Sequence, residues 1–115
     1  MIKPAVEGIL SVMRAALNHK VKRVVYTSTE LAVMMKAPKN RKEKYNEEDW
    51  FDLEVLGTYE KSKFLAENAA CDFVNSLPDG EKFELTTILP AFVQGPPLVT
   101  SDFSSGAIMK MLMLG

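Results

Sequence analysis

The spacing of hydrophobic positions changes several times along the chain, and each change marks an expected boundary between elements. From Pro4 to Asn18 the apolar residues recur every three or four positions, which places them on one face of an α-helix. Pro4 suits the first turn of that helix, because an N–H at this position would have no partner within the helix. Runs rich in β-branched residues at 21–27 and 83–89 predict two short strands.

Two more helices are expected in the second half of the chain. Residues 57–58 open one helix, which continues with apolar residues at helical spacing and ends at the turn residues 77–80. Residues 102–105 can cap a short last helix over residues 106–114. Its methionines are expected to pack in a core, because methionine is a flexible apolar residue that fills core gaps. They are Met109, Met111 and Met113.

The stretch from residue 30 to residue 56 has no regular pattern. Residues 36–44 are rich in lysine and arginine, but the acidic residues directly after them nearly cancel this charge. A solvated surface loop is therefore favoured over a nucleic-acid contact. Trp50 and Phe51 are expected to pack the loop against the body of the protein. Long loops inside compact domains are often functional, and we expect this one to lie over an active site.

The order of these elements predicts an α/β fold. Two strands joined by a helical crossover are normally parallel, so the carboxyl ends of both strands should lie at one edge of the sheet. In open α/β sheets, ligands bind at that edge. The helix that begins at residues 57–58 should start close to it.

Tyr59 and Lys63 are the strongest candidates for chemistry. They lie four residues apart, about one helical turn, and so share one face of their helix. A cation beside a phenol stabilises the phenolate. Such a tyrosine can pass a proton to or from a carbonyl or alcohol oxygen near neutral pH. The spacing can also arise by chance.

Two other stretches converge on the same edge of the sheet. Thr27, Ser28 and Thr29 follow the first strand, and residues 90–93 follow the second. The three hydroxyls can serve a ligand site, or they can cap the next segment. The convergence of three separate stretches favours an active site that includes Tyr59.

Composition excludes several classes of function. The chain has 115 residues, 47% of them hydrophobic, and a net charge of -1, which suits one small globular domain without the field needed to attract nucleic acid or an anionic membrane. It has neither a membrane-length apolar run nor a signal-peptide pattern, so a soluble cytoplasmic protein is expected. The single cysteine, Cys71, is expected to be buried and inert. The single histidine, His19, is expected at a helix end rather than in a metal site.

Five motifs occur in the order found in the extended short-chain dehydrogenase/reductases, the NAD-dependent epimerase/dehydratase superfamily. Nearly the whole chain resembles this family, and most closely its dihydroflavonol reductase and cinnamoyl-CoA reductase-like carbonyl reductases. The motifs are Pro4–Gly8, Lys22–Ser28, Tyr45–Trp50, Tyr59–Lys63 and Leu89–Pro96.

The resemblance implies a role for each site residue. Tyr59 would be the general acid, and Lys63 would assist it and hydrogen-bond the nicotinamide ribose. Thr29 falls on the third catalytic position, which is usually serine. NADP is favoured over NAD as the cofactor, and no metal is implied. The positions implied to bind the cofactor are Thr27, Ser28, Tyr59, Lys63, Pro90, Val93 and Ser105.

The family's glycine-rich turn after the first strand, which holds the cofactor pyrophosphate, is missing from this sequence. Residues 1–115 are therefore interpreted as one partial Rossmann-type domain, truncated at both ends, without the glycine-rich half and the substrate lobe. The expected function is NAD(P)H-dependent reduction of an aldehyde or ketone, and the isolated chain is expected to be inactive. Alternatives are an epimerase, a dehydratase, a 3β-hydroxysteroid dehydrogenase-like enzyme, or a non-catalytic fragment. The chain could form a homo-oligomer or associate with a full-length homologue.

Overall fold

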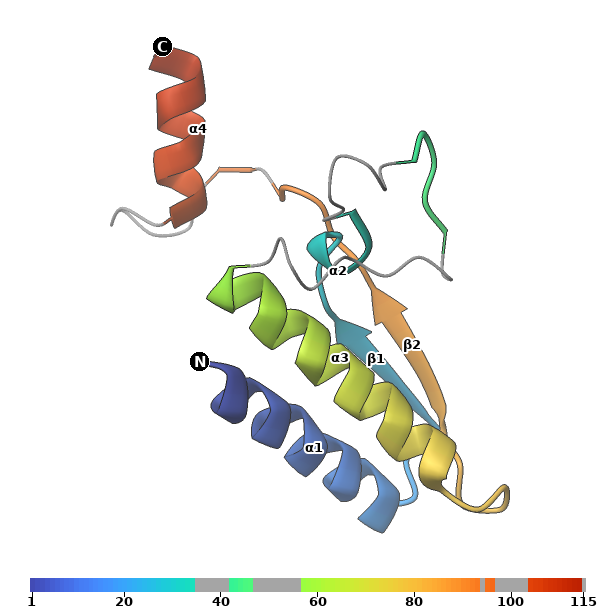
Figure 1. The fold of residues 1–115 in the computed structure, drawn as a ribbon. Helices are drawn as coiled ribbons and strands as arrows, with labels where there is room; N and C mark the ends of the chain where they lie inside the picture. The colour runs from blue at the N-terminus through green and yellow to red at the C-terminus, as the bar shows by residue number, and fades with distance from the viewer. Residues whose placement is uncertain (35–41, 47–56, 94, 97–103, 115) are drawn as a thin grey trace.

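The computed structural model (Figure 1) describes residues 1–34, 42–46, 57–93, 95–96 and 104–114. Its elements are α1 (Ile2–Asn18), β1 (Arg23–Thr27), α2 (Leu31–Met34), α3 (Thr58–Ser76), β2 (Glu84–Ile88) and α4 (Ser104–Leu114). The predicted helices and strands are confirmed, with boundaries that differ by a few residues. The short helix α2 was not predicted. The expected packing of Trp50 and Phe51 lies outside the described residues.

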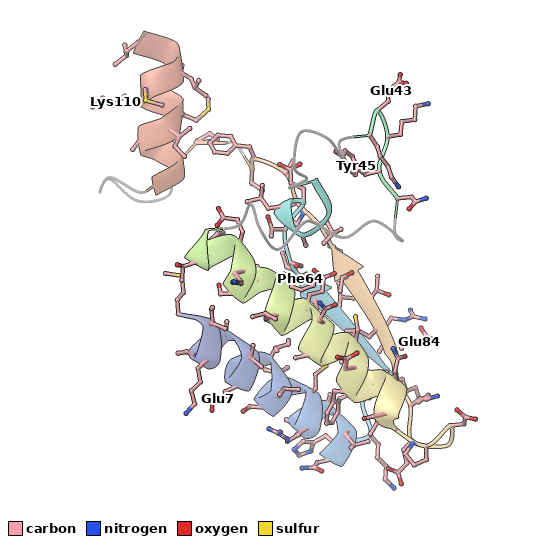
Figure 2. The ribbon with its side chains drawn as sticks, viewed as in Figure 1. Glu7, Glu43, Tyr45, Phe64, Glu84 and Lys110 are labelled. Carbon is pink, nitrogen blue, oxygen red and sulfur yellow. The ribbon has the colours of Figure 1, made fainter. Side chains whose placement is uncertain are left out.

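The two strands form a parallel sheet, as predicted. Their register runs from Arg23 opposite Glu84 to Thr27 opposite Ile88. At the start of the strands, the Arg23 Nη2 and Glu84 Oε2 atoms form an exposed ion pair at 2.6 Å, and Figure 2 labels Glu84 at this end of the sheet. Both strands therefore finish together at the opposite end.

The pairing continues past the carboxyl ends of the strands. The Ser28 N–H donates to the Ile88 carbonyl at 2.8 Å, and the Glu30 N–H donates to the Pro90 carbonyl at 3.1 Å. These two bonds hold the segment after β1 beside the end of β2 and the segment that follows it. The two stretches that were expected to share one edge of the sheet do so.

Helices α1 and α3 lie side by side over one face of the sheet and run opposite to the strands, so that α3 begins where the strands end (Figure 1). Along β1 the residues alternate, with Val24 and Tyr26 half-buried and Val25 exposed. Val25 on β1 and Ile88 on β2 are 56% and 51% exposed. In the described part of the chain, helices thus cover one face of the sheet and leave the other open.

The hydrophobic core lies between α1, the second half of α3 and the start of β2. Its buried members are Met13, Ala16, Ala70, Val74 and Phe83. The two alanines belong to the two packed helices, and their small side chains let the helix axes approach closely. This packing fixes α3 on the sheet, and α3 carries the candidate catalytic residues.

The prediction that the methionines of α4 pack in a core is wrong for two of them. Met111 is 65% exposed and Met113 is 78% exposed, while Met109 is half-buried. The physical reason is that α4 does not pack extensively on any other described element. In Figure 1 it stands apart from the sheet and the other helices. In the described ranges, no helix has both the length and the apolar character needed to cross a membrane.

Candidate active site

Helix α3 begins at a glycine that allows a close backbone cap. Gly57 is the N-cap, and its carbonyl accepts the Lys61 N–H at 3.1 Å. A Cβ atom on Gly57 would come within 2.5 Å of the Glu60 carboxylate, so a side chain here would displace Glu60. Glu60 lies in the first turn, where a negative charge is favourable. The helix therefore starts directly before Tyr59 and places it at the carboxyl edge of the sheet.

Tyr59 and Lys63 lie on one face of α3, as their spacing predicted. The Lys63 Nζ atom is 5.8 Å from the centroid of the Tyr59 ring, within the range of a cation–π contact. Tyr59 is 49% exposed, and Lys63 is half-buried. The phenol is therefore accessible to a small molecule and has a positive charge beside it.

The three hydroxyls after β1 have different environments. Thr27 is exposed, Ser28 is buried and Thr29 is half-buried. The Thr29 Oγ1 atom accepts the Leu31 N–H at 3.4 Å, which caps α2. The Ser28 hydroxyl donates to a carboxylate oxygen of Glu67 on α3. The capping interpretation thus describes Thr29, while Ser28 joins the strand end to α3.

The remaining predicted cofactor residues lie after β2 and in α4. Pro90 is half-buried beside the segment that carries Thr29, to which its carbonyl is hydrogen-bonded through Glu30. Val93 is 76% exposed. Ser105 belongs to α4, and its side chain lies outside the described residues. The structure therefore brings Pro90 to the strand-end site and leaves Val93 open to solvent.

Glu67 is a site residue that the sequence analysis missed. It is only 3% exposed, and its carboxylate accepts the Ser28 hydroxyl. It follows Lys63 by four residues and Tyr59 by eight, so all three lie on one face of α3. The signal in the sequence was a carboxylate one turn beyond the Tyr–Lys pair, among small apolar residues that pack inward.

Tyr26 on β1 is a second missed residue of the site. Its side chain is half-buried on the face of the sheet that the helices cover. Burial raises the pKa of Tyr26, and the negative charges of Glu67 and of an ionised Tyr59 raise it further. Tyr26 thus lies within electrostatic reach of both Tyr59 and the buried carboxylate of Glu67.

Cys71 lies one turn beyond Glu67 on α3 and is half-buried rather than fully buried. Burial raises the pKa of its thiol, and the carboxylates of Glu67 and Asp72 add to the rise. The thiolate is therefore disfavoured, in agreement with the expectation of an inert thiol. Across the described ranges, no three His, Cys, Asp or Glu side chains gather as a metal site.

The arrangement can transfer a proton at an accessible edge of the sheet. It presents a phenol with a neighbouring ammonium group, a threonine hydroxyl on the adjacent strand end, and apolar surface from Pro90. A phenol that is supported by a cation is suited to protonate an oxygen on which negative charge develops.

The chain is similar to known reductases of plants and yeasts. An anthocyanidin reductase of Arabidopsis thaliana is 36% identical over 124 aligned residues, which cover 100% of this chain and 35% of the relative. A dihydroflavonol 4-reductase of the same plant is 37% identical over 109 residues, which cover 88% of this chain and 27% of the relative. An NADPH-dependent methylglyoxal reductase of Saccharomyces cerevisiae is 34% identical over 113 residues, which cover 89% of this chain and 33% of the relative. The resemblance to dihydroflavonol reductases is confirmed.

A solved structure has the same fold over the aligned region. The crystal structure of Gre2 in complex with NADPH, from Candida albicans, matches 98% of this chain and 38% of its own, with a TM-score of 0.76 and 31% identity. The chain thus spans about a third of the length of the curated relatives it matches. The partial Rossmann-type α/β fold is confirmed. The sequence pattern of the 3-beta hydroxysteroid dehydrogenase/isomerase family matches residues 1–111, and the chain belongs to that family.

Proposed function

We propose that the protein is an NADPH-dependent oxidoreductase that reduces the carbonyl group of a small aldehyde or ketone, with Tyr59 as the general acid. The observation that carries the proposal is the position of the Lys63 ammonium, 5.8 Å from the centroid of an accessible Tyr59 ring at the edge where both strands finish. The similar proteins are reductases, and two of them are described with NADPH, which supports the same reaction class and the same cofactor.

Each residue of the pair has a separate task in the proposed reaction. NADPH, when bound, supplies a hydride to the carbonyl carbon. Tyr59 donates its hydroxyl proton to the carbonyl oxygen as negative charge develops there. Lys63 stabilises the phenolate that remains, because its positive charge lies beside the ring. Tyr59 then regains a proton from solvent, so the products are an alcohol and NADP⁺.

Thr29 is the proposed second donor to the carbonyl oxygen. A hydroxyl has one proton and two lone pairs. The cap on α2 uses a lone pair of Thr29 Oγ1, which leaves the proton available for the substrate. The backbone around Thr29 is held by two hydrogen bonds, one to the last residue of β2 and one to the segment that follows it. A donor that is fixed before the reaction begins lowers the barrier more than one that must reorient.

The residues present fit the nicotinamide end of the cofactor. The Lys63 ammonium can donate hydrogen bonds to ribose hydroxyls, and Pro90 supplies an apolar surface near the strand ends. We place Thr27, Val93 and Ser105 in the same proposed site on the basis of the family resemblance, and Ser28 beside it, because its hydroxyl donates to Glu67. The 115-residue sequence has no glycine-rich strand–turn–helix for the pyrophosphate. We therefore expect these 115 residues alone to bind NADPH weakly and to reduce carbonyls very slowly.

A hybrid enzyme tests the proposal. Residues 1–115 replace the aligned segment of Candida albicans Gre2, which supplies the rest of the fold. We expect the hybrid to oxidise NADPH in the presence of methylglyoxal. Tyr59→Phe should lower kcat by about 10²–10⁴-fold, the usual contribution of general acid–base catalysis. NADPH affinity should be nearly unchanged.

A matched pair of lysine variants sharpens this test. Lys63→Met should lower kcat, whereas Lys61→Met, on another face of the same helix, should leave it within about twofold because substitutions away from the site have small effects. An active Tyr59→Phe hybrid would contradict the proposed role of Tyr59. Tight NADPH binding by the 115-residue chain alone would contradict the account of the pyrophosphate site.

The family description supports a second candidate function, the oxidation of a 3β-hydroxysteroid. The same Tyr–Lys pair would then act in reverse, with Tyr59 as the base that removes the hydroxyl proton. The hybrid does not decide between these substrates. The longer protein that contains these residues, assayed with NADP⁺ and a 3β-hydroxysteroid and in parallel with NADPH and small carbonyls, does.

A further inference from the structure

Glu67 carries a buried carboxylate that the proposed reaction does not use. Glu67 is 3% exposed, and Ser28, whose hydroxyl donates to it, is 8% exposed. A buried carboxylate is strongly unfavourable unless hydrogen bonds compensate for the lost water. Such a group adds little to the free energy of unfolding, since a protein with an apolar side chain of similar size in its place is often at least as stable.

The bond between Ser28 and Glu67 joins the two elements that carry the candidate catalytic residues. Ser28 directly precedes Thr29, and Glu67 lies one turn beyond Lys63 and two turns beyond Tyr59 on the same face of α3. The hydrogen bond therefore runs between the Thr29 segment and the Tyr59 helix.

The opposite side of the Thr29 segment is tied to β2 and to the segment that follows it. The Ser28 N–H donates to Ile88, and the Glu30 N–H donates to Pro90. These backbone bonds fix the position of the segment relative to β2, but they do not set its distance from α3. The side chains of Ser28 and Glu67 meet across that remaining direction.

We infer that Glu67 is a positioning residue, which holds the Ser28 segment against α3 and so fixes the separation of the Thr29 hydroxyl and the Tyr59 phenol. This inference rests on the proposed function, because both hydroxyls must reach one carbonyl oxygen. A displacement of reacting groups by about 1 Å can lower a rate by about 10²-fold. A directional hydrogen bond to a charged acceptor is short and geometrically defined, which suits this task.

Hydrogen exchange of the 115-residue chain tests the tether without any cofactor or substrate. Ser28→Ala should raise the exchange rate of the Glu30 amide by about tenfold, because the segment opens more often when it loses a strong hydrogen bond. Ser28→Thr keeps the hydroxyl and should restore slow exchange. Ser11→Ala is the matched control, since Ser11 donates at 2.8 Å to a carbonyl on an exposed part of α1.

Kinetics of the hybrid enzyme test whether the tether serves catalysis. Glu67→Leu and Ser28→Ala should each lower kcat by about 10²-fold, with the KM for NADPH unchanged. Glu67→Gln keeps an oxygen that accepts the Ser28 hydroxyl and should recover most of kcat, and Ser28→Thr should do the same. The double variant Ser28→Ala with Glu67→Leu should be no slower than either single variant, because both substitutions remove the same bond.

The outcomes separate the inference from the function on which it rests. An active hybrid in which Glu67→Leu or Ser28→Ala leaves kcat intact would overturn the positioning role, even if Glu30 exchange increased. A rise in the KM for NADPH upon Ser28→Ala alone would overturn it in favour of a direct cofactor contact by Ser28. A hybrid that binds NADPH and reduces no carbonyl would overturn the proposed function. In that case normal Glu30 exchange in Ser28→Ala would overturn the tether as well.

Discussion

The two halves of α3 have opposite characters. The second half packs Ala70 and Val74 into the hydrophobic core against α1 and the start of β2. The first half carries Tyr59, Lys63 and Glu67 on one face, with a phenol that is half exposed and a carboxylate that is buried and hydrogen-bonded. One helix thus contributes apolar packing at one end and the candidate chemistry at the other.

This difference shows how a short element can hold reactive groups firmly. The apolar half fixes the helix axis, because it is packed on two sides, and a rigid helix carries that position to its other end. The polar half then needs few contacts of its own. Substitutions in the two halves should therefore change different properties, stability in one and the protonation and reactivity of side chains in the other.

The largest effect is expected from truncation of the core that faces the apolar half. Met13 is fully buried, and Met13→Ala should lower the free energy of unfolding by about 3 kcal/mol through lost burial and a cavity. Met111→Ala should change it by less than about 0.5 kcal/mol, because Met111 is 65% exposed. Urea unfolding followed by circular dichroism measures both. Equal effects of the two substitutions would show that the core is not where the structure places it.

Most elements were predictable because their sequence patterns are long enough to have a period. The seventeen residues of α1 and the nineteen of α3 repeat apolar positions over several turns, and each strand is a β-branched run. Helix α2 has only four residues, too few to show a period, and the Leu31 N–H at its start donates to the Thr29 side chain. The exposure of Met111 and Met113 was not predictable, since apolar composition does not reveal whether a partner surface lies beside α4.

The candidate site was predictable only in part. The spacing of Tyr59 and Lys63 is local, because both lie within one helical turn, and the parallel crossover places the strand ends near them. Glu67 needed knowledge of the fold, since its burial depends on Ser28, which is thirty-nine residues away along the chain. A buried carboxylate and an exposed one look the same in sequence until a partner is found across the fold.

The next largest effect is expected in the pH dependence of stability, and it concerns Tyr26, which faces the polar half of α3. Its pKa is raised above the ordinary value of 10.0 by burial, by Glu67 and by Tyr59. Folding therefore favours the protonated phenol. This contribution to stability is fully present below the unfolded-state pKa of about 10 and is lost as the pH rises through the raised value.

Urea unfolding at a series of alkaline pH values measures this loss. Tyr26→Phe should reduce the decline in stability with pH, because phenylalanine has no proton to lose. Glu67→Gln should also reduce it, because one cause of the raised pKa is removed. Glu84→Gln is the control, since Glu84 lies in an exposed ion pair at the other end of the sheet. A pH dependence that is identical in the Tyr26→Phe variant would show that Tyr26 does not titrate as the structure predicts.

The smallest effect is expected at Cys71, in the second half of α3, one turn beyond Glu67 and next to Ala70 of the core. Its thiol pKa is raised by burial first, and then by the carboxylates of Glu67 and Asp72. Glu67→Gln should lower this pKa, increase the thiolate fraction at neutral pH and accelerate alkylation by iodoacetamide a few-fold. Asp72→Asn should give a smaller acceleration, because Asp72 contributes less to the shift. The chain has a single cysteine, so the rate reports this site alone. An unchanged alkylation rate in the Glu67→Gln variant would show that Glu67 does not raise the pKa of the Cys71 thiol as the structure predicts.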